Sequence, residues 1–189
     1  TAVERIFPSP LVVTAGLMVD RDDMLPAGRT KSGSYIYMVG KPDSSLGATR
    51  YQVMKNGAPF GKTCDPDFEQ EKAFRERAMR TASSHAATSG RIVAGGGLAV
   101  ALASEAIASG TGMEIKLEPE TSAEKMLFSE GGARAIYAVA ADRANEFEKI
   151  WEGFPCKKIG IAGGSAFIWG KFFSIDIETL LKTFREAID

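Results

Sequence analysis

The middle of the chain, Arg91–Ala108, reads RIVAGGGLAVALASEAIA. Its first four residues, 91–94, contain Ile and Val and are expected to form a short strand. From Leu98 onward an apolar run is broken by Ser104 and Glu105. It is shorter than the roughly 20 residues that span a bilayer, so we expect a buried helix. The glycines between strand and helix therefore form a strand-to-helix turn.

This glycine turn, Gly95, Gly96 and Gly97, has two interpretations. Glycines let the backbone approach a ligand, and the dipole of the following helix favours an anion such as phosphate. Glycines equally permit tight packing of a strand against a helix. The pattern is not G-x-G-x-x-G, and no G-K-[S/T] follows. Phosphate contact and packing both remain open for these residues.

A second loop with chemical groups is LFSEGG, residues 127–132. It combines the Ser129 hydroxyl, the Glu130 carboxylate and two glycines just before an expected strand at 134–140. Such a loop suits contact with a nucleotide, a metal or a neighbouring domain, and it suits a capped turn equally well.

Elsewhere, apolar β-rich segments alternate with helical ones. Further strands are expected at 11–19, 35–40, 112–117, 157–162, 167–169 and 172–175. Further helices are expected at 47–54, 65–84, 119–128, 142–151 and from about 178 to 188, with Ser44 or Ser45, Asp65 and Asp142 as the first caps. Short links, such as the one between 167–169 and 172–175, favour hairpin pairs. Gly163–Ser165 is also expected to be a hairpin turn. The class is therefore α+β, with a mixed sheet of about six strands flanked by helices, in one domain over 1–189.

Composition limits the chemistry. The 189 residues carry 23 Lys and Arg against 24 Asp and Glu, a net charge of -1. Nucleic acid is not a favoured partner of such a chain. It has one histidine, His85, expected at the surface, and two cysteines, Cys64 and Cys156, expected to be plain thiols. We expect no catalytic residue and no metal ligand. With no signal peptide or spanning segment, we also expect a cytoplasmic protein that meets no membrane.

Several segments together resemble a known family. Gly95–Ala103 resembles the GGLAVALAE stretch of the phosphoribosylformylglycinamidine synthase family, synthetase subunit. Leu127–Glu130 is similar to its LFSE motif, Leu46–Tyr51 to its LGGSEY loop, and Pro8–Val12 to its PTP entry. The blocks occur in the same order and cover nearly the whole chain. The glycine stretch is shared with aminoimidazole ribonucleotide synthetase and its selenophosphate, thiamine-phosphate and hydrogenase-maturation relatives.

The resemblance implies that this chain is the C-terminal companion domain of a longer multidomain ligase in purine biosynthesis. That enzyme converts formylglycinamide ribonucleotide to the formylglycinamidine ribonucleotide, using ATP, magnesium and ammonia. Its implied partners are the N-terminal domains of the same chain, a glutaminase subunit or domain and a small accessory subunit. Its catalytic histidine and magnesium carboxylates are expected upstream of Thr1. The fragment itself is expected to be structural and inactive, and to need no cofactor. Another ATP-dependent relative and a non-enzymatic binding module are the alternatives.

One segment departs from the family pattern. The family carries His-Asp-x-Ser-Asp/Glu immediately before its Gly-Gly-Leu, whereas Arg91–Gly95 occupies that place here. The charged and hydroxyl groups that would touch a nucleotide are missing. The departure weakens any ligand role for the glycine turn.

Overall fold

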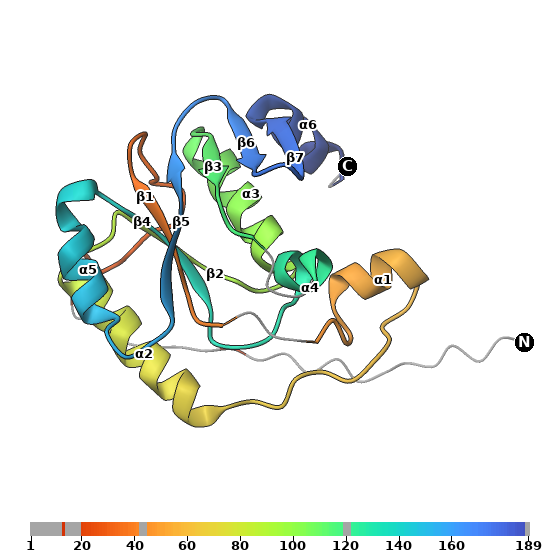
Figure 1. Ribbon diagram of the computed structural model, residues 1–189, viewed down its shortest axis with the longest axis horizontal. Helices are drawn as coiled ribbons and strands as arrows, with labels where there is room; N and C mark the ends of the chain where they lie inside the picture. The colour runs from red at the N-terminus through yellow and green to blue at the C-terminus, as the bar shows by residue number, and fades with distance from the viewer. Residues whose placement is uncertain (1–12, 14–19, 42–44, 119–121, 188–189) are drawn as a thin grey trace, which may run out of the picture.

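The computed structural model describes residues 13, 20–41, 45–118 and 122–187, and in them one sheet carries helices on both faces (Figure 1). The strands are β1 (Tyr35–Val39), β2 (Ser89–Ile92), β3 (Met113–Ile115), β4 (Ala135–Val139), β5 (Cys156–Ala162), β6 (Ala166–Trp169) and β7 (Phe173–Asp176). Their order is β2-β4-β1-β5-β3-β6-β7. Only β3 and β6 run parallel; the other described pairs are antiparallel. The α+β class with a mixed sheet is confirmed, with seven strands against the expected six or so.

The helices form two layers. They are α1 (Arg50–Asn56), α2 (Phe68–Ser83), α3 (Gly97–Ser109), α4 (Ala123–Phe128), α5 (Ala144–Ile150) and α6 (Ile177–Glu186). One face of the sheet packs against α3, α4 and α6, and the opposite face packs against α2 and α5 (Figure 1). The glycine turn and the loop after α4 therefore lie on the same side of the sheet.

The position of α3 follows from its apolar spacing. Leu98, Ala101, Leu102 and Ala106 are buried against strands of the sheet, and these positions form one stripe of a helix. Burying each leucine contributes about 1.5–3 kcal/mol. Glu105 lies on the same buried stripe, so the fold must supply hydrogen-bond donors for its carboxylate.

The second face is built from aromatic rings. Trp151 lies 5.6 Å from both Phe74 and Tyr137, measured between ring centroids, and Phe147 lies 4.9 Å from Tyr37. The Trp151 indole donates to Thr81 Oγ1 at 3.0 Å, so its polar nitrogen is satisfied inside the core. This cluster fixes α2 and α5 to the sheet.

The observed helix starts differ from the expected ones. Asp67, not Asp65, caps α2, because its Oδ1 accepts from Gln70 N–H at 3.0 Å. Thr49 caps α1 in place of Ser44 or Ser45. Asp142 falls in a 3-10 turn, Ala141–Arg143, and caps no helix. Local hydroxyl and carboxylate candidates compete at each start, and the backbone geometry selects among them.

Gly163–Ser165 is not a hairpin turn, because β3 lies between β5 and β6 in the sheet. The glycines instead bond to the chain just before β3, where Gly163 N–H donates to the Gly112 carbonyl at 2.7 Å.

The β6–β7 hairpin is confirmed. The strand expected at 11–19 lies outside the described residues apart from Val13. None of the helices in the described ranges combines the length and the apolar character that a membrane-spanning segment requires.

Candidate functional site

The glycine turn packs closely against α4. Gly96 and Gly97 have positive φ angles of 86° and 72°. A Cβ atom at Gly97 would lie 2.6 Å from the Leu127 carbonyl oxygen and 2.7 Å from the Phe128 Cα atom. Only glycine tolerates both the left-handed backbone and this approach of two backbones. Of the two interpretations of the turn, close packing therefore has direct support at Gly97.

The Glu130 carboxylate accepts hydrogen bonds at the start of α3. Its Oε1 atom accepts from the Gly96 N–H at 2.7 Å and from the Arg50 N–H at 2.8 Å. A helix N-terminus favours a negative charge, and here the chain supplies its own. Glu130 thus joins three segments: the glycine turn, the loop after α4 and the start of α1.

Ser129 supports this loop from inside. Its side chain is fully buried, and its carbonyl accepts from Arg134 Nη2 at 2.5 Å. Arg134 also donates through Nε to the Gly131 carbonyl at 3.0 Å. Ser129 Oγ has no hydrogen-bond partner among the described residues. The sequence placed Ser129 and Glu130 side by side as candidates, and the structure separates them into a buried support and a partly exposed acceptor.

Helix α1 closes over the same loop. The Tyr51 ring stacks on Phe128 with centroids 4.7 Å apart and planes 7° from parallel. The Tyr51 hydroxyl donates to Glu124 Oε1 at 2.7 Å, and Lys55 Nζ lies 3.3 Å from the same oxygen. The Tyr51 hydrogen bond and then the Lys55 charge hold the pKa of Glu124 below its ordinary value. No residue of α1 is buried, so these contacts and Glu130 keep it in place.

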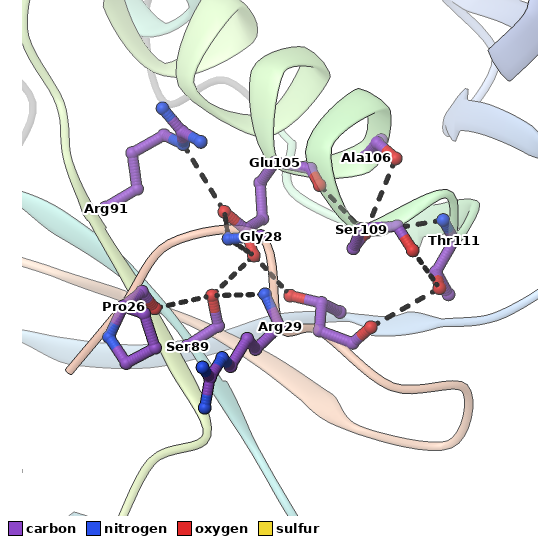
Figure 2. Close-up of polar contacts among 10 residues, drawn as sticks. Pro26, Gly28, Arg29, Ser89, Arg91, Glu105, Ala106, Ser109 and Thr111 are labelled. Carbon is purple, nitrogen blue, oxygen red and sulfur yellow. Dashed lines mark hydrogen bonds and ion pairs between the residues drawn. The ribbon is translucent and has the colours of Figure 1, made fainter. Parts of the chain in front are cut away.

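A buried carboxylate on α3 organises a second polar cluster (Figure 2). Glu105 is 3% exposed. Its oxygens accept from Thr30 Oγ1 at 2.7 Å, Ser89 Oγ at 2.5 Å and Gly28 N–H at 2.9 and 3.0 Å. Arg91 Nε lies 3.4 Å away and supplies the positive charge. Glu105 therefore ties the 26–30 segment and β2 to α3.

This role of Glu105 is not predicted from the sequence, where Glu105 appears only as a break in an apolar run. The spacing could have indicated it. Leu98, Ala101 and Glu105 fall at i, i+3 and i+7, so Glu105 lies on the same helix stripe as the leucines, and that stripe faces the core. The donors at Thr30 and Ser89 are remote in sequence and carry no such signal.

The Glu130 contact bears on whether the glycine turn is open to an anion. The Gly96 N–H already donates to a carboxylate, and a bound phosphate would face that negative charge. In residues 20–41, 45–118 and 122–187, no group of three His, Cys, Asp or Glu side chains is arranged to hold a metal ion. The arrangement joins three segments of the chain and presents a surface at the start of α3.

The remaining candidate groups lie elsewhere. His85 is exposed after α2 with a φ of 53°, as expected for a surface loop. Cys64 and Cys156 both carry thiols and are half-buried. Burial, with a smaller contribution from Glu148, raises the pKa of Cys156 to about 12, so this thiol is protonated at neutral pH.

Curated relatives match almost the whole chain. Phosphoribosylformylglycinamidine synthase subunit PurL of Moorella thermoacetica is 30% identical over 190 residues, covering 97% of this chain and 26% of that protein. The PurL subunit of Synechocystis is 30% identical over 164 residues, covering 85% of this chain and 21% of that protein. The chain spans about a quarter of the length of these relatives.

Solved structures share the fold. Thermotoga maritima PurL complexed with FGAR superposes with a TM-score of 0.68 at 14% identity, covering 85% of this chain and 30% of that one. Thiamine-monophosphate kinase from Stenotrophomonas maltophilia gives 0.57 at 18% identity, covering 80% of this chain and 54% of that one. At these identities the likeness concerns the fold alone.

The family model described as "AIR synthase related protein, C-terminal domain" matches residues 31–167. That range includes the glycine turn, α3, the Glu130 loop and the sheet from β1 into β6. The resemblance drawn from the glycine stretch and the LFSE motif is confirmed at this level. The chain belongs to the AIR synthase related C-terminal domain family.

Proposed function

We propose that residues 1–189 form one companion domain of a PurL-like ligase, which converts formylglycinamide ribonucleotide to the formylglycinamidine ribonucleotide. The observation that carries this proposal is the match to PurL subunits over up to 97% of the chain. A shared fold with the kinase would not select this activity, because related folds host different reactions. Neither another ATP-dependent relative nor a free-standing binding module has comparable support.

In this proposal, ATP and magnesium act in the longer enzyme, outside the part described. The structures of Thermotoga maritima PurL with ATP and with ADP support nucleotide use by such an enzyme. The domain would work with N-terminal domains of the same polypeptide, a glutaminase and a small accessory subunit. A structure described as PurLQS supports assembly with other subunits. We place the enzyme in the cytoplasm, with no nucleic acid or membrane partner.

The glycine turn and the Glu130 loop would serve as an interdomain element. Gly95, Gly96, Gly97, Ser129 and Glu130 lie together, with the outward donor of Gly96 held by Glu130. A loop closed by its own carboxylate has a fixed shape without a ligand. Such a loop suits rigid contact with a neighbouring domain better than phosphate capture, which would have to displace a charged group.

The test is a chimera. The C-terminal quarter of Moorella thermoacetica PurL is replaced by this chain, and ATP-dependent amidine formation is measured with the purified chimera and with purine-requiring cells that lack PurL. We expect activity and growth without added purine. A matched chimera that carries Gly97→Val should fail, because its turn cannot pack against α4. A folded, stable chimera without turnover would contradict the proposal.

The isolated chain provides a complementary test. We expect no amidine formation from ATP and ammonia by the 189-residue protein, because the proposal assigns the catalytic groups to the other domains of the longer enzyme. Turnover by the purified chain would contradict the assignment of catalysis to the rest of the enzyme.

A further inference from the structure

Within the described part of the chain, an apolar groove lies open along helix α2 beside the edge strand β2. Phe68, Met79 and Ile92 are 76%, 66% and 56% exposed. They line a groove of about 720 Å³ together with Phe74, Ala78 and Ala82. Scattered single apolar residues are ordinary on protein surfaces, but a contiguous group marks an interaction site. We call this surface the α2 groove.

The α2 groove carries a projection and a matching recess. Phe68 stands out at the first residue of α2, whereas Ala78 and Ala82 provide small side chains in the last two turns before its end at Ser83. A large ring and a pocket of alanines on one helix face can each receive the other when two such helices lie antiparallel. An unrelated partner would need only one of the two features.

Two of the three charges on the groove are also self-complementary. Glu71, Lys72 and Arg75 line it, and none of them has an ion pair within the described part of the chain. The complementary two are Glu71 and Arg75. A two-fold axis midway between them runs two copies of α2 antiparallel and sets Glu71 of each copy opposite Arg75 of the other. The same operation sets Phe68 opposite Ala78.

We propose that the α2 groove binds a second copy of this chain in an isologous, antiparallel α2–α2 contact. Phe68 of one copy fills the alanine recess of the other, and two Glu71–Arg75 pairs fix the register. A single-helix interface lies at the small end of specific interfaces, so we expect a dissociation constant on the order of 10–100 μM.

The experiment is sedimentation velocity from about 1 μM to about 500 μM, a range that brackets such weak association. The wild-type mass should rise from 20.2 kDa toward twice that value. Phe68→Ser should weaken association at least about tenfold. Phe184→Ser, at a 52% exposed phenylalanine on α6, should leave it unchanged. Circular dichroism checks that each variant is folded.

Charge-reversal variants provide the decisive test in the same sedimentation experiment. Glu71→Arg alone and Arg75→Glu alone should each abolish association, because like charges then face each other across the axis. An equimolar mixture of these two variants should associate again. In the mixed dimer, the two arginines of one variant face the two glutamates of the other, so both contacts between copies are complementary. Within each variant helix the two positions carry like charges, so recovery reports the contact between copies and not a pair inside one helix.

Three results would overturn the proposal. One is a constant mass of 20.2 kDa over the whole range. Another is association that Phe68→Ser leaves intact or that Phe184→Ser removes equally. The third is a mixture of the two charge variants that stays monomeric.

Discussion

Glu105 and Glu130 are two carboxylates that hold loops against α3, and they do so under opposite conditions. Glu105 is 3% exposed and accepts from a backbone amide, two hydroxyls and Arg91. Glu130 is partly exposed and accepts from two backbone amides through one oxygen. Both carboxylates accept hydrogen bonds from donors of the chain. Water could replace Glu130 as the acceptor, but it cannot reach the buried position of Glu105.

The difference indicates what each carboxylate contributes. Removing Glu105 would leave donors from two segments, 26–30 and β2, without their acceptor, so its main effect is on folding. Removing Glu130 exposes two amides that water can reach, so its main effect is on the shape of one loop. The first carboxylate is part of the core, and the second controls a surface.

The largest effect should come from Glu105→Ala. We expect about 3–5 kcal/mol less free energy of unfolding, because Arg91 and two hydroxyls lose a buried acceptor. Urea denaturation followed by circular dichroism measures it. Glu105→Gln should cost less, since an amide oxygen still accepts. The matched control is Glu114→Ala, at an exposed strand position, with a change within about 0.5 kcal/mol. A loss below about 1 kcal/mol for Glu105→Ala would show that the cluster is not a core element.

Gly97→Ala should follow, at about 2–4 kcal/mol. The methyl group meets the Leu127 carbonyl oxygen at 2.6 Å and adds left-handed strain at a φ of 72°. Gly110→Ala separates the two causes, because Gly110 has a φ of 63° but no atom within 4 Å of the added carbon. We expect about 1 kcal/mol there. Equal losses in thermal unfolding would mean that strain, not packing against α4, restricts Gly97.

Glu130→Ala should cost about 1–2 kcal/mol, because the two amides exchange a charged acceptor for water. Its clearer effect should be faster amide hydrogen exchange at Gly96 and Arg50, with the exchange of the Leu102 amide unchanged. Glu130→Gln should restore most of the protection, because its amide oxygen can accept both bonds. Unchanged amide exchange at Gly96 in Glu130→Ala would show that Glu130 does not control the shape of this loop.

The smallest effect concerns α1. The Tyr51 hydroxyl and Lys55 lower the pKa of Glu124, so the associated stability is present above the ordinary carboxyl pKa and is lost as pH falls through the lowered value. Tyr51→Phe should raise the Glu124 pKa toward its ordinary value in a carboxyl-detected NMR titration. Tyr35→Phe, on β1, should not change it. If the Glu124 pKa is the same in wild type and in Tyr51→Phe, the Tyr51 hydrogen bond does not stabilise the Glu124 carboxylate and does not hold α1 in place.

The sequence was most informative where one periodic pattern determined the result. The apolar stripe of α3 and the β-rich runs predicted the buried helix, most strands and the α+β class, because burial depends on spacing alone. The prediction for Gly163–Ser165 was wrong because strand order depends on β3, which enters the sheet between β5 and β6. The residues around Gly163–Ser165 do not indicate that β3 lies between β5 and β6.

Sites depend even more on remote partners. Glu130 and Gly96 were both selected from the sequence, but their hydrogen bond joins residues from different loops. The Glu105 cluster needed Thr30 and Ser89, far apart in the chain. Phe68 is apolar and yet 76% exposed, because α2 begins at Phe68 and its first turn extends past the core.

The chain's own Glu130 accepts from Gly96 at the glycine turn, and we propose that this turn therefore binds no phosphate. The most direct test is an NMR titration of the ¹⁵N-labelled 189-residue chain with ATP and magnesium. We expect the amide signals of Gly95, Gly96 and Gly97 to stay in place, with no saturable binding in the micromolar range. Saturable shifts at these amides with a micromolar dissociation constant would contradict it.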